Sequence, residues 1–451
     1  MKTTIRHRIA VAGTYLSRLT LGAMFVFSGF VKAVDPMGTV YKLEDYFAAF
    51  GMGAWFPRWE VMILALLLST LEFCLGIGLL TGTRKTSSAI LSLLFLGVMT
   101  PLTFYLYLAN PVSDCGCFGD AWLLTNGETF AKNLLMLAAA ILLYVKHRDL
   151  ASLFTPKTEW LCSLYSLLFI LALSSYCLHS LPILDFRPYK IGVNIREGMS
   201  IPEGKKPDQW ESLFLMEKEG EQREFSLDNY PDSTWHYVST RSVLKEKGYT
   251  PPIHDFVLEL MEDGTDLTDS LLTTPGYTFL LVAHRIEETD DSHIDLINEI
   301  YDYSVEHGYG FFALTSSPQE EVEIWSERTG GEYPFCIADD ITLKTMIRSN
   351  PGLILLKGGT ILQKWSHNDL PDEYVLTAPL EQLEIGQLRP TSLVRTLGYT
   401  LFWFIIPLLF IIAADTYWTQ YQRRKSRMTQ GEPDKEEESN LKLNEEEEKE
   451  S

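Results

Sequence analysis

Cysteine is scarce in this sequence, and the spacing that a zinc site needs is missing. The chain has 451 residues and six cysteines. The cysteines that lie close together are too few, and no His–His pair accompanies them, so the sequence gives no support for a zinc site. No internal repeat is visible, and the length predicts two or three domains.

Positive charge is also scarce, in two regions. Residues 184–393 hold 38 acidic and 17 basic residues, and residues 431–451 hold 10 acidic and 3 basic residues, in a chain of net charge −21. Because nucleic acid requires a basic surface, we expect no nucleic acid partner. The remainder is mostly apolar, which predicts a membrane part with two acidic, water-exposed parts.

The N-terminus lacks a small-residue cleavage site. It has basic residues followed by a long apolar run, which predicts a retained first membrane helix instead of a signal peptide. Six stretches approach the length of about 20 apolar residues that spans a bilayer. They are residues 14–33, 61–82, 87–109, 129–146, 161–182 and 397–417.

Basic residues cluster in alternate connections between these stretches. They precede the first stretch, join the second to the third and the fourth to the fifth, and follow the sixth. The positive-inside bias therefore places both termini in the cytoplasm of a bacterial inner membrane. Residues 34–60, 110–128 and 184–393 then face the periplasm. The acidic C-terminal tail, residues 421–451, is predicted to be disordered and cytoplasmic.

The second half of the outer region has the pattern of an α/β fold. Strands are expected at 277–284, 309–317, 334–339 and, as a hairpin, 351–365, with helices at 293–308 and 318–330. This alternation predicts a largely parallel sheet with helices on its faces. Residues 184–250 give no firm prediction.

Two thiols stand one residue apart in "DCGCFGD" (114–120). Cys115 and Cys117 are within bridging reach because Gly116 can adopt unusual dihedral angles. Three interpretations remain open: a bridge that is made and broken, a static bridge, and a metal or cofactor anchor. The small, strained ring favours the first, since strained bridges are easier to reduce.

The neighbouring charges bear on this chemistry because the attacking species is a thiolate. Asp114 and Asp120 should raise the thiol pKa by like-charge repulsion, unless Lys32 or Lys132 lies near enough to offset them. The other four cysteines, 74, 162, 177 and 336, are expected to be small buried hydrophobes.

Glu72 lies near the middle of an apolar stretch, where an ionisable group usually faces a partner or a wet cavity. It is either a proton-handling or quinone-contacting carboxyl group, or a helix–helix hydrogen bond that fixes packing. Lys32 and Arg18, near the two ends of the first stretch, are expected to extend to the membrane surface. Glu72 is then the one clear charge inside the membrane.

Three segments carry a family resemblance: "RLTLGAMFVFSGFVKAVDP" (18–36), "STLEFCLGIGLLTG" (69–82) and "CGCFGD" (115–120). They resemble the DoxX/MauE family of redox-associated membrane proteins, over about a third of the chain. The resemblance implies a four-helix bundle over residues 1–150, linked to quinone or thiol redox work. A fifth helix (151–183) and a sixth (394–420) would then flank the outer region.

The segment "RSNPGLILLKGGTILQKW" (348–365) is similar to the part of a thioredoxin-like fold that places a cis-proline before a hairpin. This implies such a fold over about residues 252–385, with Pro351 as that proline. The position of the family's Cys-x-x-Cys is occupied by "VAHRIEETDDSH" (282–293), which has no cysteine. Dithiol exchange is therefore excluded there, although a peptide-binding surface beside Pro351 could remain.

Two hypotheses follow. In the first, Cys115 and Cys117 relay electrons between an envelope protein client and a membrane quinone, with Glu72 in the catalytic site. In the second, the protein is a non-catalytic accessory, with a structural bridge, a degenerate binding domain and a tail that docks a cytoplasmic partner. Transport has little support, since no broken helices mark a substrate site.

Overall fold

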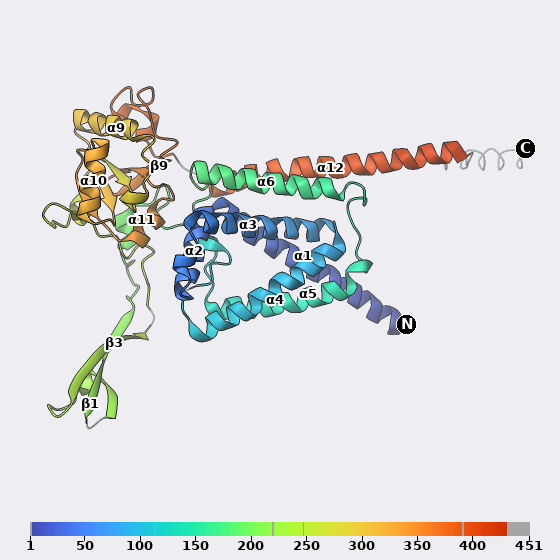
Figure 1. The fold of residues 1–451 in the computed structure, drawn as a ribbon, viewed down its shortest axis with the longest axis horizontal. Helices are drawn as coiled ribbons and strands as arrows, with labels where there is room; N and C mark the ends of the chain where they lie inside the picture. Colours follow the sequence, from blue (N-terminus) through green and yellow to red (C-terminus); the bar gives the residue numbers. More distant parts are fainter. Residues whose placement is uncertain (1, 113, 219–220, 247, 390–391, 431–451) are drawn as a thin grey trace, which may run out of the picture. The chain divides into compact units, whose positions relative to one another are not determined.

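The computed structural model describes residues 2–112, 114–218, 221–246, 248–389 and 392–430 (Figure 1). It divides the chain into two compact units. The membrane unit comprises residues 1–186 and 392–451, and the soluble unit comprises residues 187–391.

Six helices of the membrane unit are long and apolar enough to cross a membrane, by length and composition, among the described residues. This confirms the six predicted stretches. One boundary was wrong: residues 421–430, expected in the disordered tail, continue the last helix. Their bounds are Lys2–Val34 (α1), Arg58–Thr81 (α3), Lys85–Ala109 (α4), Asn126–Lys146 (α5), Glu159–His179 (α6) and Leu393–Gln430 (α12). A helix that the sequence analysis missed, α2 (Pro36–Ala49), follows α1, with Asp35 capping its first turn.

Glycines allow α1 and α3 to pack at close range. A Cβ added at Gly29 would lie 2.4 Å from the backbone nitrogen of Phe73, and one added at Gly76 would lie 2.5 Å from that of Val26. Small residues permit this approach between membrane helices. The close packing brings residues 28–32 of α1 beside Glu72 of α3, which matters for the site below.

Arg18 does not extend to the surface as expected. It is 6% exposed, and its guanidinium donates to the carbonyls of Leu79 (2.5 Å), Leu80 (2.8 Å) and Ala151 (2.7 Å). The first two carbonyls belong to the last turn of α3, where a helix leaves acceptors unsatisfied. Arg18 therefore ties α1 to the end of α3, a partner that spacing alone could not reveal.

Helices α6 and α12 lie side by side (Figure 1). The hydroxyl of Tyr165 donates to the carbonyl of Trp403 (2.8 Å). The buried carboxylate of Asp415 accepts from the hydroxyls of Thr155 (2.9 Å) and Thr158 (2.7 Å). Polar groups thus fix α12 to the segment that begins α6.

The soluble unit contains a six-stranded sheet in the order β4-β7-β6-β5-β8-β9. The strands are Glu259–Leu260 (β4), Tyr277–Val282 (β5), Gly310–Thr315 (β6), Phe335–Ile337 (β7), Gly352–Lys357 (β8) and Thr360–Ser366 (β9). The strands expected from sequence are present. The expectation of a largely parallel sheet was wrong. Among the described strands only β5–β6 and β6–β7 pair in parallel, because the β8–β9 hairpin adds antiparallel to β5 and β4 adds antiparallel to β7.

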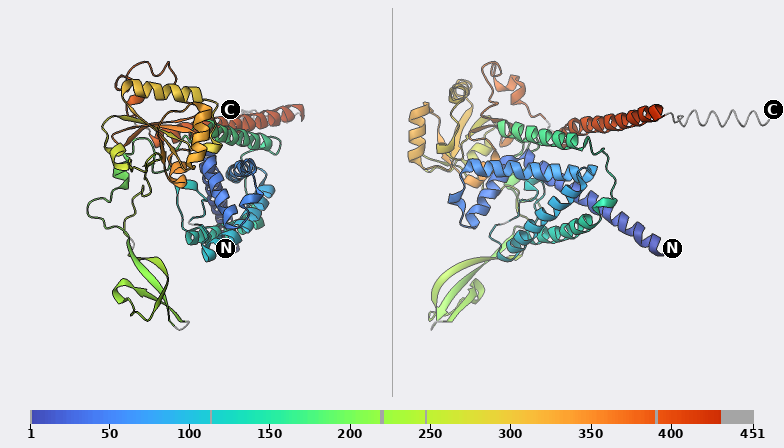
Figure 2. Two further views of the ribbon diagram at one scale, coloured as in Figure 1. Left: turned by 60° about the vertical axis from the view of Figure 1, so that its left-hand side comes forward. Right: turned by 45° about the vertical axis from the view of Figure 1, so that its right-hand side comes forward.

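Helices α9 (Ile294–His307) and α10 (Gln319–Thr329) cover one face of this sheet (gold and orange in Figure 2). Ile297 of α9 and Trp325 of α10 join Phe279 and Leu353 of the sheet in one buried cluster. Three shorter helices complete the unit: Ile195–Met199 (α7), Thr268–Thr273 (α8) and Asp340–Met346 (α11).

A separate three-stranded antiparallel sheet occupies part of the region where the sequence gave no firm prediction. Its order is β2-β1-β3, and its strands are Gln209–Lys218 (β1), Glu221–Ser226 (β2) and His236–Glu246 (β3). Aromatic contacts brace it, such as Phe225 against Trp235 at 4.9 Å between ring centroids.

Candidate functional site

The two close cysteines lie in the segment 110–125 between α4 and α5, called the thiol loop below. Side chains from α2 and from the loop itself hold its backbone. Asp114 accepts from the nitrogen of Gly116 (2.9 Å) and pairs with Lys42 of α2 (3.0 Å). The hydroxyl of Tyr46, also of α2, donates to the carbonyl of Cys115 (2.6 Å).

Gly116 has the dihedral angles expected for the residue between the thiols. Its φ is +62°, a left-handed conformation that costs an L-residue about 1–2 kcal/mol. A Cβ there would also lie 2.6 Å from Cγ of Lys42. Glycine therefore suits both the backbone turn and the close approach of α2.

The end of the thiol loop is fixed by a capping box at the start of α5. The hydroxyl of Thr125 accepts from the nitrogen of Glu128, whose carboxylate accepts from the nitrogen of Thr125. Such reciprocal bonds satisfy two donors of a helix start. They set the position at which α5 begins, and so the positions of Lys132 and Asn133 further along it.

Lys32 and Glu72 form a buried ion pair between α1 and α3. The ammonium of Lys32 lies 2.6 Å and 2.9 Å from the two carboxylate oxygens of Glu72, and the side chains are 7% and 4% exposed. This corrects the expectation that Lys32 extends to the surface and that Glu72 is the one intramembrane charge. A buried charge is retained only when it is well paired, and each residue provides the other's partner.

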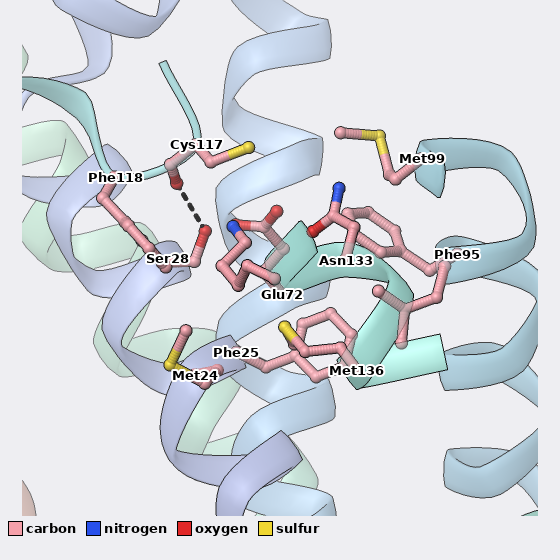
Figure 3. Close-up of a pocket in the computed structure, with 12 residues that line it drawn as sticks. Met24, Phe25, Ser28, Glu72, Phe95, Met99, Cys117, Phe118, Asn133 and Met136 are labelled. Carbon is pink, nitrogen blue, oxygen red and sulfur yellow. Dashed lines mark hydrogen bonds between the residues drawn. The ribbon is translucent and has the colours of Figure 1, made fainter. Parts of the chain in front are cut away.

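The ion pair is connected to the thiol loop through Ser28. Lys32 donates to the hydroxyl of Ser28 one turn earlier on α1 (2.8 Å), and that hydroxyl donates to the carbonyl of Cys117 (2.7 Å) (Figure 3). Glu72, Lys32, Ser28 and Cys117 thus form one continuous chain of polar contacts.

The two thiols differ in their surroundings. Cys115 is 7% exposed, Cys117 is half-buried, and neither is bridged in the structure. A hydrogen bond from Cys115 lowers the pKa of the Cys117 thiol to about 6, helped by Lys132 and Lys32 and opposed by burial and Glu72. The same hydrogen bond, together with burial, raises the pKa of Cys115.

Asp114 and Asp120 were expected to raise the thiol pKa unless Lys32 or Lys132 offset them, and for Cys117 the pKa is lowered. Neither carboxylate is among the main influences on the pKa of Cys117, and Asp114 already pairs with Lys42. The positive charges of Lys132 and Lys32 lower the pKa of Cys117, as the sequence analysis suggested. Cys117 therefore has the character of a nucleophile or leaving group, whereas Cys115 stays protonated.

Cys117 and Glu72 line one pocket between α1, α3, α4 and α5 (Figure 3). Lys132 lines the same pocket. The cavity itself has a volume of about 30 Å³, and the figure rises to about 340 Å³ only when the space at its open side is counted. Its polar end also includes Ser28 and Asn133. Its remaining wall is apolar, formed by Met24, Phe25, Phe95, Leu96, Met99, Phe118 and Met136.

An apolar wall with a few polar groups at one end suits a flat apolar ring that carries oxygens. In chemical character the lining residues therefore suit the head of a membrane quinone, the acceptor named in the first hypothesis. Within the described residues, no group of three or more His, Cys, Asp or Glu side chains could hold a metal ion.

The remaining cysteines lie apart from this pocket. Cys74 is in α3, Cys162 and Cys177 are buried in α6, and Cys336 is fully buried in β7. The structure thus brings Cys115, Cys117 and Glu72 together. The sequence analysis missed Ser28, Asn133 and the methionines; the spacing of four residues between Ser28 and Lys32 was the one available signal.

In the soluble unit, the peptide bond before Pro351 is cis, as expected. The loop after β5 packs against this segment: Asn350 donates to the carbonyl of Arg285 (2.9 Å), and the nitrogen of Asp290 donates to the carbonyl of Asn350 (3.1 Å). No thiol lies in that loop.

Together these features define a multi-span membrane protein with a paired-thiol loop over a buried ion pair, joined to an α/β unit that resembles thioredoxin-like folds. Residues 10–146 match the family of methylamine utilisation protein MauE. Residues 210–247, which include most of β1 to β3, match a domain of unknown function, DUF8463. Among curated proteins, none matches this chain.

Solved structures resemble part of the chain. StoA from Bacillus subtilis is 16% identical, with 24% of this chain and 84% of that chain covered and a TM-score of 0.20. The bacterioferritin comigratory protein of Xanthomonas campestris is 12% identical, with 29% and 92% covered and a TM-score of 0.22. An uncharacterised protein from Geobacillus kaustophilus is 15% identical, with 31% and 82% covered and a TM-score of 0.24.

Proposed function

We propose that this protein is a membrane thiol–disulfide oxidoreductase. It takes electrons from the thiols of an envelope protein client and passes them through Cys115 and Cys117 to a membrane quinone. The observation that carries the proposal is the position of Cys117, whose pKa is lowered to about 6, in the wall of an interhelical pocket. Paired thiols and an apolar wall beside them are the two features that support the proposal.

The first half-reaction starts from the Cys115–Cys117 disulfide. A client thiolate attacks the sulfur of Cys115, the S–S bond breaks, and Cys117 leaves as a thiolate, which its low pKa favours. The second client thiol then attacks the mixed disulfide, and Cys115 leaves as a thiol. The client gains one disulfide and releases one proton, while the pair gains two electrons and one proton.

In the second half-reaction the disulfide forms again. Cys115 and Cys117 give two electrons to the quinone as their sulfurs bond, and Cys115 gives up its proton. Glu72 acts here as a positioning residue. It holds Lys32, which holds Ser28, which binds the carbonyl of Cys117.

The proposal includes a location. The charge distribution favours a bacterial inner membrane with both termini in the cytoplasm, so that the thiol loop and residues 187–391 face an oxidising periplasm. The client is proposed to bind the soluble unit beside Pro351. Residues 431–451 lie outside the described residues, and their cytoplasmic partner is inferred from acidic sequence alone.

The test uses the full chain in lipid nanodiscs, reduced and then freed of reductant. Decylubiquinone is added, remaining thiols are tagged with an alkylating mass label, and formation of the Cys115–Cys117 disulfide is followed with time. We expect rapid oxidation in the wild type and in the control Cys336→Ser. Oxidation no faster than in buffer without quinone would overturn the proposal.

The second candidate is an accessory protein with a permanent Cys115–Cys117 bridge. The observation that favours it is the absence of thiols from the loop after β5 in the soluble unit. Mass-label trapping in growing cells separates the two. A pool of mixed reduced and oxidised pairs supports exchange, whereas a fully oxidised pool that resists mild reductant supports a permanent bridge.

A further inference from the structure

Lys132 occupies the polar end of the pocket without a counter-ion of its own. It is half-buried in the second turn of α5, lines the pocket, and its ammonium lies 4.2 Å from the ring centroid of Phe118. Within the part of the chain that the structure describes, no carboxylate pairs with it. The other lysine near the pocket, Lys32, is fully engaged by Glu72 and Ser28.

The charges at this end of the pocket balance only when Cys117 is a thiolate. Lys32 and Glu72 neutralise each other, which leaves the ammonium of Lys132 facing the Cys117 thiolate. When Cys117 enters a disulfide, its negative charge is lost. A lone ammonium then remains beside an apolar wall, where an uncompensated charge is unfavourable.

The proton count of the second half-reaction has a matching gap. Reduction of a quinone to a quinol consumes two electrons and two protons. The pair supplies both electrons but only one proton, from Cys115, because Cys117 has already lost its own. One proton must come from another group at the pocket.

We propose that Lys132 is this group: it stabilises the Cys117 thiolate and then donates a proton to the quinone oxygen as the disulfide forms. The reactants are Cys117 thiolate, Cys115 thiol, Lys132 ammonium and quinone. The products are the disulfide, Lys132 amine and quinol, so atoms, electrons and charge all balance. The inference rests on the proposed quinone-linked exchange and identifies a catalytic residue within it.

Glu72 and Lys32 are less suited to this role. The ammonium of Lys32 makes three close contacts, with both oxygens of Glu72 and with Ser28. As the carboxylate of this pair, Glu72 has no proton to give. A proton lost from Lys32 would break the buried ion pair and leave Glu72 as an unpaired charge, which is strongly destabilising. Lys132 can lose its positive charge at the step in which the disulfide forms, because the negative charge of the Cys117 thiolate disappears in the same step.

Two substitutions separate the charge of Lys132 from its proton. Lys132→Arg keeps a positive charge that does not deprotonate, because the guanidinium pKa exceeds 12 in proteins. Lys132→Met keeps an apolar stem and removes the charge. Lys146→Arg, at the other end of α5, is the matched control.

The first measurement compares two oxidants on full-length reduced protein in nanodiscs. Decylubiquinone must receive protons, whereas ferricyanide accepts electrons without them. We expect Lys132→Arg to be oxidised by decylubiquinone roughly 100-fold or more slowly than the wild type, the usual size of a general-acid effect. Oxidation by ferricyanide should stay within about twofold of the wild type, since the thiolate remains stabilised.

The second measurement does not depend on the quinone. The rate of Cys117 alkylation by iodoacetamide is followed against pH. Lys132→Met should move the midpoint upward by about one pH unit, the usual size of a lost opposite charge, and Lys132→Arg should leave it unchanged. The charged and titratable groups that influence Cys117 are Cys115, Lys132, Lys32 and Glu72, so Lys32 and Glu72 stay unaltered.

The outcomes distinguish the two proposals. If quinone does not oxidise the wild type, the proposed function fails. If quinone oxidises the wild type and Lys132→Arg equally fast, only the role of Lys132 as proton donor fails. An unchanged alkylation midpoint in Lys132→Met would remove its role in stabilising the thiolate.

Discussion

The membrane unit holds two thiols one residue apart in a loop braced by α1 and α2, while the described soluble unit holds a single cysteine within a strand. Cys117 lies beside Lys132 and the Lys32–Glu72 pair, whereas Cys336 is fully buried. The close pair of thiols thus lies in the helical unit, and the one cysteine of the described α/β unit lies in its core. Fold similarity transfers architecture, and function must be argued from the site.

The largest expected effect tests whether the thiols of the membrane unit act as one. Cys115→Ser, Cys117→Ser and the double variant should each lose quinone-dependent turnover by about 100-fold or more, and equally, because partners in one chemical step are non-additive. Turnover of client thiols or a small dithiol in nanodiscs measures this. Additive losses, or an equal defect in Cys177→Ser, would mean that this pair is not the working couple.

The next effect concerns buried charge, which the membrane unit concentrates at its site. Glu72→Leu leaves Lys32 buried and unpaired, so we expect a loss of about 3–5 kcal/mol in the free energy of unfolding in mild detergent. Adding Lys32→Met should restore most of it. The exposed pair Arg328–Asp291 of the soluble unit (3.1 Å) is the contrast: Asp291→Asn should cost under about 1 kcal/mol. A mild effect of Glu72→Leu alone would show that Lys32 finds another partner.

The pH dependence of the alkylation rate should differ between Cys117 of the membrane unit and Cys336 of the soluble unit. The pKa of Cys117 is lowered to about 6 and burial raises that of Cys336 to about 11. Because only the thiolate reacts, the alkylation rate of Cys117 should fall about tenfold from pH 7 to pH 5, while Cys336 stays unreactive at both. Residue-resolved mass spectrometry after brief iodoacetamide treatment gives both rates. A flat profile for Cys117 over this range contradicts the assigned surroundings.

A smaller effect compares two glycines that share a left-handed conformation. Gly116→Ala should cost about 1–2 kcal/mol from backbone strain and also slow quinone-dependent oxidation, since its Cβ meets Lys42. Gly358→Ala, in the β8–β9 turn at φ +54° with no atom within 4 Å of its Cβ, should show the strain alone. Equal oxidation rates in the two variants would indicate that the close contact of Gly116 with Lys42 does not affect disulfide formation.

The smallest expected effect is none. The soluble unit, expressed as residues 187–391, should fold and remain soluble but catalyse no insulin reduction with dithiothreitol, because its one cysteine, Cys336, is in the core. Turnover above the uncatalysed rate would show that the soluble unit has a reactive thiol of its own.

The pattern of apolar residues along the sequence predicted much of the architecture. Six apolar stretches became six candidate spanning helices, and strands such as 277–284 and the hairpin at 351–365 were anticipated, because burial imposes a periodicity on the sequence. The antiparallel side of the sheet was missed because strand direction depends on how the β8–β9 hairpin adds to β5. Residues 209–246 were missed because a small, exposed sheet buries too little apolar surface to impose a clear pattern.

The candidate site was only half predictable. Cys115, Cys117 and Glu72 were found because paired thiols and an intramembrane carboxyl group are rare enough to stand out. Lys32 was misplaced because its partner lies on another helix, 40 residues away in sequence. The lowered pKa of Cys117 follows from which sulfur donates to which, and that depends on the fold of the loop.

The packing of α6 against α12 has a consequence for how such a chain could have evolved. The soluble unit is inserted between these two helices, which bind each other through Tyr165 and, by way of the segment before α6, through Asp415. Contacts within the membrane unit therefore close the insertion site without help from the inserted domain. An arrangement of this kind lets recombination exchange one inserted domain for another while the helical unit is inherited unchanged.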